Sequence, residues 1–124
     1  MVNETTWHRD PAKQTTFTWN ATNEGIEINH NNGNASYTIP WNIFHAVYVQ
    51  AKIIGNNNGG QVVAGLSRTS PPAGSVGKWV NTQNFNIAPG TLTSGHLSFL
   101  GPIYGRMGFI QRNLHGNTII WHMI

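Results

Sequence analysis

The stretch that decides the expected fold is TLTSGHLSFLGPIYGRMGFI, residues 91–110. Its apolar side chains recur at three- and four-residue spacing, at Leu97, Leu100, Tyr104 and Met107. This spacing predicts an amphipathic helix over residues 93–107. Thr93 or Ser94 can cap its first turn, and Gly108 can end it.

The opposite face of this helix is unusual because small residues and one cation stand where a surface helix normally carries lysine and glutamate. They are Gly95, Ser98, Pro102, Gly105 and Arg106. Small side chains let the backbone approach a phosphate group or another helix closely. Two interpretations stay open: a nucleic-acid contact anchored by Arg106, or tight packing of Gly95, Gly101 and Gly105 inside the core. Pro102 removes the hydrogen bond to the Ser98 carbonyl, so we expect a kink or a break.

Further elements are expected on both sides of this helix. Residues 109–112 and 118–124 predict a hairpin with NLHG as its tip. Pro40 opens a helix over residues 41–55, and Ser75 can cap a short helix over residues 76–83. QVVAGL, residues 61–66, is either a short buried strand or the start of a helix.

The first third of the chain is expected to be β-structure. Residues 15–22 alternate aromatic and polar side chains, which predicts a half-buried strand. Residues 25–39 predict a hairpin that turns at Asn32-Gly33. At 124 residues the chain is expected to form one domain of the α+β class, with a β-rich part at residues 1–39 and a helix-and-hairpin part at residues 40–124.

Charge is distributed unevenly. All four acidic residues lie at or before Glu27, so residues 28–124 contain no carboxylate side chain. The same stretch contains the cations Lys52, Arg68, Lys78, Arg106 and Arg112. Such a region attracts polyanions, and nucleic acid is the leading partner class. The alternative is a thinly charged surface that depends on Asn, Thr and Ser for solubility, since only 9% of residues are charged.

The order helix, loop, short helix, turn, amphipathic helix and hairpin resembles the winged helix-turn-helix superfamily over residues 40–124. That resemblance implies a DNA-binding module, with double-stranded DNA expected rather than RNA, whose helix 93–107 enters the major groove while the hairpin 109–124 acts as a wing. The implied contact residues, together with two cations of the basic region, are Arg68, Lys78, Ser94, His96, Ser98, Arg106, Arg112, Asn113, His115 and Asn117.

Two other functions stay open. Histidines beside arginine and lysine are compatible with a metal-independent nuclease, in which histidine acts as acid and base. Tryptophans with Asn-Gly loops are compatible with a carbohydrate- or protein-binding β module. No catalytic residue, cofactor or metal site is assigned, because magnesium enzymes need carboxylates and the histidines lack metal-ligand spacing.

The sequence gives no reason to expect a membrane protein. There is no cysteine, no signal peptide and no apolar run long enough for a membrane span, so a cytoplasmic protein is expected. The last expected strand runs to Ile124 without a tail, which leaves an origin in a larger protein, or a homo-oligomer, open.

Overall fold

The computed structural model describes residues 1–30, 33–116 and 118–124, and it has the α+β class predicted from the sequence. Two antiparallel sheets have the strand orders β1-β2-β3-β4 and β5-β7-β6. The strands are β1 (Val2–Thr5), β2 (Thr16–Ala21), β3 (Gly25–His30), β4 (Ala35–Pro40), β5 (Gln61–Val63), β6 (Ile110–His115) and β7 (Thr118–Met123). The helices are α1 (Trp41–Asn56), α2 (Val76–Gln83) and α3 (Leu97–Arg106).

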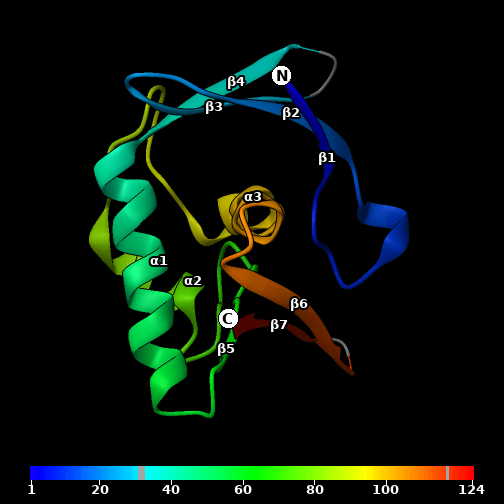
Figure 1. Cartoon of the computed structure of the whole chain (residues 1–124), viewed down its shortest axis with the longest axis vertical. Helices are drawn as coiled ribbons and strands as arrows, with labels where there is room; N and C mark the ends of the chain where they lie inside the picture. Colours follow the sequence, from blue (N-terminus) through cyan, green and yellow to red (C-terminus); the bar gives the residue numbers. More distant parts are fainter. Residues whose placement is uncertain (31–32, 117) are drawn as a thin grey trace.

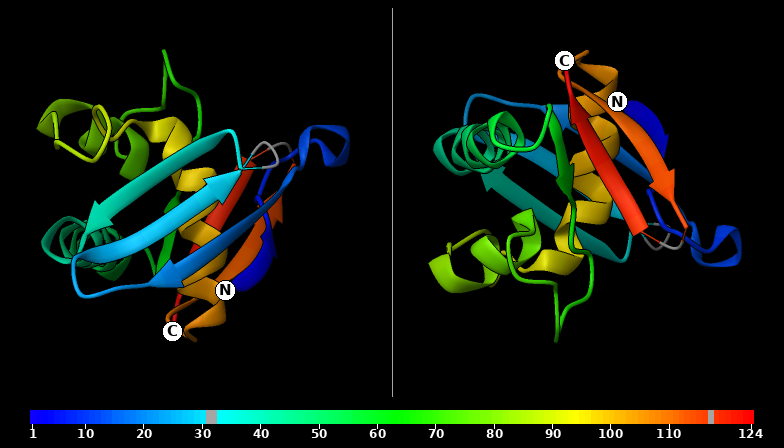
Figure 2. Two further views of the ribbon diagram at one scale, coloured as in Figure 1. Left: turned by 90° about the horizontal axis from the view of Figure 1, so that it is seen from above. Right: turned by 90° about the horizontal axis from the view of Figure 1, so that it is seen from below.

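Helix α3 lies at the centre of the molecule, with the N-terminal sheet on one side and the C-terminal sheet on the other (Figures 1 and 2). Four of its side chains are fully buried: Leu97, Leu100, Ile103 and Tyr104. The Tyr104 hydroxyl donates a hydrogen bond to the Phe44 carbonyl of α1, which ties the two helices together. The predicted apolar face of this helix is therefore correct.

The N-terminal sheet packs one face onto α3. Along β2, Phe17 and Trp19 are buried while Thr16 and Asn20 are exposed, which is the alternation expected of a strand with one solvated face. Ile28 of β3 and Ile39 of β4 extend the same buried surface. The turn predicted at Asn32-Gly33 falls partly outside the described residues, because Asn32 is not among them.

Helices α1 and α2 begin and end close to their predicted positions. The α1 helix follows Pro40 and buries Phe44, Val47 and Ala51. At the start of α2 the Ser75 hydroxyl accepts a hydrogen bond from the Lys78 backbone N–H at 3.1 Å, as expected of a serine N-cap. QVVAGL begins with a strand, β5, which pairs with β7.

Of the kink or break expected at Pro102, the break does not occur. Helix α3 runs through Pro102 without a break, because the freed Ser98 carbonyl accepts a hydrogen bond from the Trp7 backbone N–H at 3.1 Å. The Trp7 ring lies on the same face, where a Cβ on Gly101 or Gly105 would come within 2.7 Å or 2.9 Å of its atoms. The absence of a side chain at Gly101 and Gly105 therefore lets the Trp7 ring pack against α3. At these two positions the small residues serve packing in the core.

Two details of the strands differ from the sequence prediction. Strand β1 was not predicted, and it pairs with β2 at the edge of the N-terminal sheet. The C-terminal hairpin is longer than expected, since Asn113 and His115 lie within β6, paired with β7, and not in a tip. Strand β6 continues through Asn113 and His115 because these residues pair with Ile120 and Thr118 of β7.

Candidate functional site

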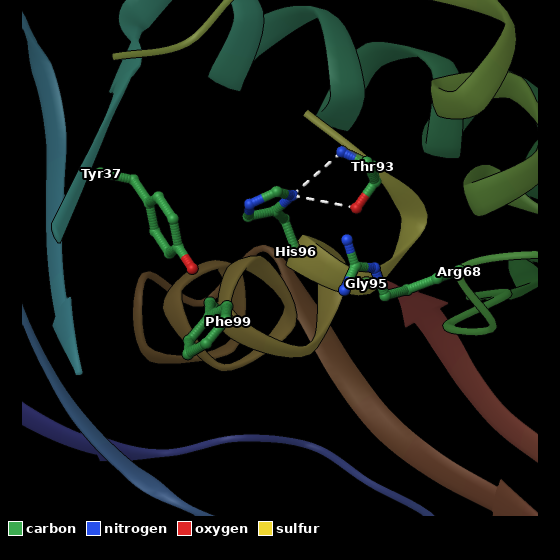
Figure 3. Close-up of a pocket in the computed structure, with 6 residues that line it drawn as sticks. All are labelled: Tyr37, Arg68, Thr93, Gly95, His96 and Phe99. Carbon is green, nitrogen blue, oxygen red and sulfur yellow. Dashed lines mark hydrogen bonds between the residues drawn. The ribbon is translucent and has the colours of Figure 1, made fainter. Parts of the chain in front are cut away.

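Two neighbouring cavities open beside the N-terminal end of α3. The larger, which we call the basic groove, has a volume of about 600 Å³. It is lined by His8, Arg9, Lys13, Val63, Gly65, Leu66, Ser67, Arg68, Ser70, Pro72, Gly95, Ser98, Thr118 and Ile119. The smaller, the aromatic pocket, has a volume of about 230 Å³ and is lined by Tyr37, Arg68, Thr93, Gly95, His96 and Phe99 (Figure 3). Arg68 and Gly95 belong to both.

One wall of the basic groove comes from the segment between β1 and β2. Its backbone is held by Asp10, whose carboxylate accepts a hydrogen bond from the Ala12 N–H at 3.0 Å. The Asp10 N–H in turn donates to His8 Nδ1 at 3.0 Å. These local bonds build a short 3-10 turn, Pro11–Lys13, and the segment brings Arg9 and Lys13 to the groove.

The opposite wall carries Arg68, on the loop between β5 and α2. The Arg68 carbonyl accepts a hydrogen bond from the Asn81 side chain at 3.4 Å. Its aliphatic stem lies on Gly95, where a Cβ would come within 2.8 Å of the Arg68 Cγ. The absence of a side chain at Gly95 therefore lets Arg68 lie across the boundary between the groove and the pocket.

The lining of the basic groove is positively charged and rich in hydroxyl groups. Arg9, Lys13 and Arg68 supply the charge, and no carboxylate is found among the described residues that line it. Ser67 and Ser70 add hydroxyls that share one hydrogen bond, which leaves one of the two protons for a ligand, whereas the Ser98 hydroxyl already donates to the Gly95 carbonyl at 2.9 Å. An anion is favoured here because three cations line the groove, and the neighbouring Asp10 carboxylate, which is not among the lining residues, accepts a hydrogen bond from the Ala12 N–H.

The aromatic pocket is built by three half-buried rings. Tyr37 of β4 and His96 meet edge to face, with their ring centroids 4.9 Å apart. Phe99 of α3 lies below them, 6.2 Å from the Tyr37 ring. Behind Tyr37, its hydroxyl and His30 Nε2 share a hydrogen bond of 2.7 Å.

His96 is held in a single orientation. The Thr93 backbone N–H donates to His96 Nδ1 at 3.0 Å, so this nitrogen must be an acceptor and the neutral ring carries its proton on Nε2. Burial lowers the pKa of His96 below its usual value and the positive charge of Arg68 lowers it further, while the backbone hydrogen bond of Thr93 partly offsets these effects. His96 is therefore a neutral donor through Nε2 at neutral pH.

Three of the predicted contact residues meet at these cavities. Arg68 and Ser98 line the basic groove, and His96 lines the aromatic pocket. Lys78 is exposed on α2 but lines neither cavity. Ser94 is fully buried, its hydroxyl donating to the Ser67 carbonyl, so the prediction that it contacts an external ligand needs correction.

The other predicted contacts lie elsewhere. Arg106 is engaged by the N-terminal strand: its Nε contacts the Glu4 carboxylate at 2.6 Å, so it is not the unpaired anchor that the sequence suggested. Arg112, Asn113 and His115 are exposed along β6 and line neither cavity, although His115 is paired with Thr118, which lines the basic groove. Asn117 lies outside the described residues.

Sequence reasoning missed several lining residues. His8, Arg9 and Lys13 were passed over because they share the N-terminal region with all four acidic residues. The run HRDPAK, residues 8–13, is dense in charged and histidine side chains, and this density was the available signal for a binding site. Tyr37 and Phe99 gave no signal, because each occupies an ordinary position in its strand or helix.

Comparisons with protein-family models, with curated proteins and with solved structures found no match. Within the described ranges, no group of three or more histidine, cysteine, aspartate or glutamate residues is arranged to hold a metal ion. None of the helices described is long and apolar enough to cross a membrane.

Proposed function

We propose that this chain binds nucleic acid and that the phosphate backbone lies in the basic groove. The observation that supports this is the convergence of Arg9, Lys13 and Arg68 on one groove, from segments far apart in the sequence, without a carboxylate among the described lining residues. Contacts between such cations and phosphates supply most of the sequence-independent affinity for nucleic acid.

The order of elements from α1 to β7 also supports a relation to winged helix-turn-helix proteins, which we keep as a proposal. In this chain, however, the N-terminal sheet and Trp7 cover much of the helix that would read the major groove. We therefore propose the basic groove, and not the outer face of α3, as the contact surface.

The test is a binding titration by fluorescence anisotropy with single-stranded and double-stranded DNA over a range of salt concentrations. Three phosphate contacts predict a log–log salt slope of roughly −2 on single strands and −2.7 on duplex DNA. The variant Arg9→Gln/Lys13→Gln/Arg68→Gln should lose roughly a hundred-fold or more in affinity at low salt and have a slope near zero.

A matched control removes the same charge from other places. Lys52→Gln/Lys78→Gln/Arg112→Gln changes three exposed cations that line neither cavity, and both triple variants lower the formal net charge from +3 by 3, to 0. The control should keep most of the affinity. Equal losses in the two variants would mean that only net charge matters, and a larger loss in the control would move the contact to the α2 and β6 surface.

A second candidate, metal-independent phosphodiester cleavage, is favoured by one observation. His30 and His96 lie on either side of Tyr37, and His96 shares the aromatic pocket with Arg68, which gives two histidines and a phosphate-binding cation in one region. Incubation with RNA in the presence of a metal chelator tests it. Cleavage that is lost in His96→Gln supports this candidate, and intact RNA excludes it.

A further inference from the structure

The aromatic pocket and the basic groove meet at Arg68 and Gly95, so one stretch of nucleic acid can reach both cavities. We propose that one unpaired base enters the aromatic pocket while the phosphates on either side of it remain at the basic groove. This inference rests on the proposed function, and it adds a preference for single-stranded over double-stranded nucleic acid.

The volume of the pocket suits one ring system. At about 230 Å³ it is smaller than the roughly 300–1,000 Å³ of sites for drug-sized ligands. A whole nucleotide therefore does not fit inside it, and the sugar and phosphate must stay outside. The pocket opens next to Arg68, so the phosphate outside it meets a cation at once.

The walls of the pocket suit a flat aromatic group such as a base. The rings of Tyr37 and Phe99 offer aromatic surface, and the guanidinium of Arg68 lies beside His96 (Figure 3). Stacking on aromatic rings and on arginine is how proteins hold unpaired bases, and it tolerates any base because each has a π face.

The pocket also has a fixed polar donor. The Thr93 N–H holds His96 Nδ1 as an acceptor, which leaves the Nε2 proton to bind a ligand. Figure 3 shows Nε2 on the side of the ring that faces Tyr37. A carbonyl oxygen or ring nitrogen on the edge of a base can accept this proton, whereas a base paired in a duplex has its Watson–Crick edge occupied.

The test compares three ligands of roughly ten nucleotides: an oligothymidine strand, the same backbone with abasic sites, and a blunt duplex. Oligothymidine should bind most tightly. Phe99→Leu keeps an apolar side chain but removes the aromatic face, and it should weaken oligothymidine binding by about 5- to 150-fold while leaving the salt slope and the affinity for the abasic strand unchanged. The matched control is Phe109→Leu, which removes a partly exposed aromatic ring that lines neither cavity and should bind like the unmodified protein.

The Phe99 ring also packs against Phe17, with centroids 5.1 Å apart, so a second measurement uses the unmodified protein. Photocrosslinking to a strand that contains 5-iododeoxyuridine, followed by mass spectrometry, should give adducts at Tyr37, His96 or Phe99. Adducts confined to Trp41 or Phe109, which are exposed outside the pocket, would overturn the proposal.

Failure of this inference differs from failure of the proposed function. If the abasic strand binds as tightly as oligothymidine and the groove triple variant still loses binding, the groove is correct and the base pocket is wrong. If the groove triple variant binds every ligand like the unmodified protein, the proposed function itself is wrong.

Discussion

A double-mutant cycle between Gly105 and Trp7 tests whether the small-residue face of α3 exists to receive the N-terminal segment. A Cβ at Gly105 would lie 2.9 Å and 3.0 Å from Trp7 Cζ2 and Cη2, closer than real Cβ contacts, while its next neighbour is the Ile110 carbonyl at 3.8 Å. The ring of Trp7 is therefore the only close obstacle to a methyl group at this position among the described residues.

The expected free energies follow from two opposing effects. Overpacking against the ring should cost about 1–3 kcal/mol, whereas replacing a helical glycine by alanine should gain up to about 1 kcal/mol. Gly105→Ala should thus lower the free energy of unfolding by up to about 3 kcal/mol in the unmodified protein. With Trp7→Ala in the background the obstacle is gone, and the same change should be neutral or stabilising by up to about 1 kcal/mol.

Urea unfolding followed by circular dichroism measures all four proteins of the cycle. Trp7→Ala alone should cost less than the about 3–5 kcal/mol of a fully buried tryptophan, because Trp7 is only half-buried. The decisive quantity is the coupling free energy, expected at about 1–3 kcal/mol. If Gly105→Ala has the same effect in both backgrounds, the ring does not rest on this helix face and the account of the glycines is refuted.

Three other predictions concern the core, the pocket and the ion pair. Tyr104→Phe should lower the free energy of unfolding by about 1–2 kcal/mol, measured by urea unfolding, because it removes the buried hydrogen bond to the Phe44 carbonyl. The lowered pKa of His96 means that the unfolded chain binds more protons than the native one just below pH about 6.5, so stability should fall as the pH drops through this range. The melting temperature of His96→Gln should depend less on pH just below pH about 6.5 than that of the unmodified protein. An unchanged pH dependence would contradict the lowered pKa of His96. Arg106→Ala should change stability by less than about 1 kcal/mol, since its side chain is 51% exposed, and should leave the salt slope for DNA unchanged; a reduced slope would return Arg106 to the nucleic-acid contact.

The elements that could be predicted from the sequence are those with local signals. Helix α2 begins after Ser75 because a serine hydroxyl caps a helix through residues three positions away. The alternation of Phe17 and Trp19 with polar residues depends only on the two-residue period of a strand. In these cases the interactions that determine the structure lie within a few residues of one another.

The features that could not be predicted depend on contacts between distant segments. The Ser98 carbonyl that Pro102 leaves without a helical donor accepts a hydrogen bond from the Trp7 N–H, and nothing near Pro102 in the sequence indicates this. The basic groove likewise exists only because the segment after β1 lies opposite Arg68. The residues around Arg9 and Lys13 in the sequence do not indicate that these cations will line a groove together with Arg68.

The position of α3 between the two sheets also determines the order in which the chain can complete its fold during synthesis. The strands β2, β3 and β4 are joined by short connections and leave the ribosome early, but α3, whose Phe99 ring packs against Phe17 of β2, is made much later. The contact between Glu4 and Arg106 spans 102 positions of the chain. The part of the nascent N-terminal sheet around Phe17 therefore lacks this helix until α3 has been translated, and apolar surface exposed in that interval favours aggregation or chaperone binding.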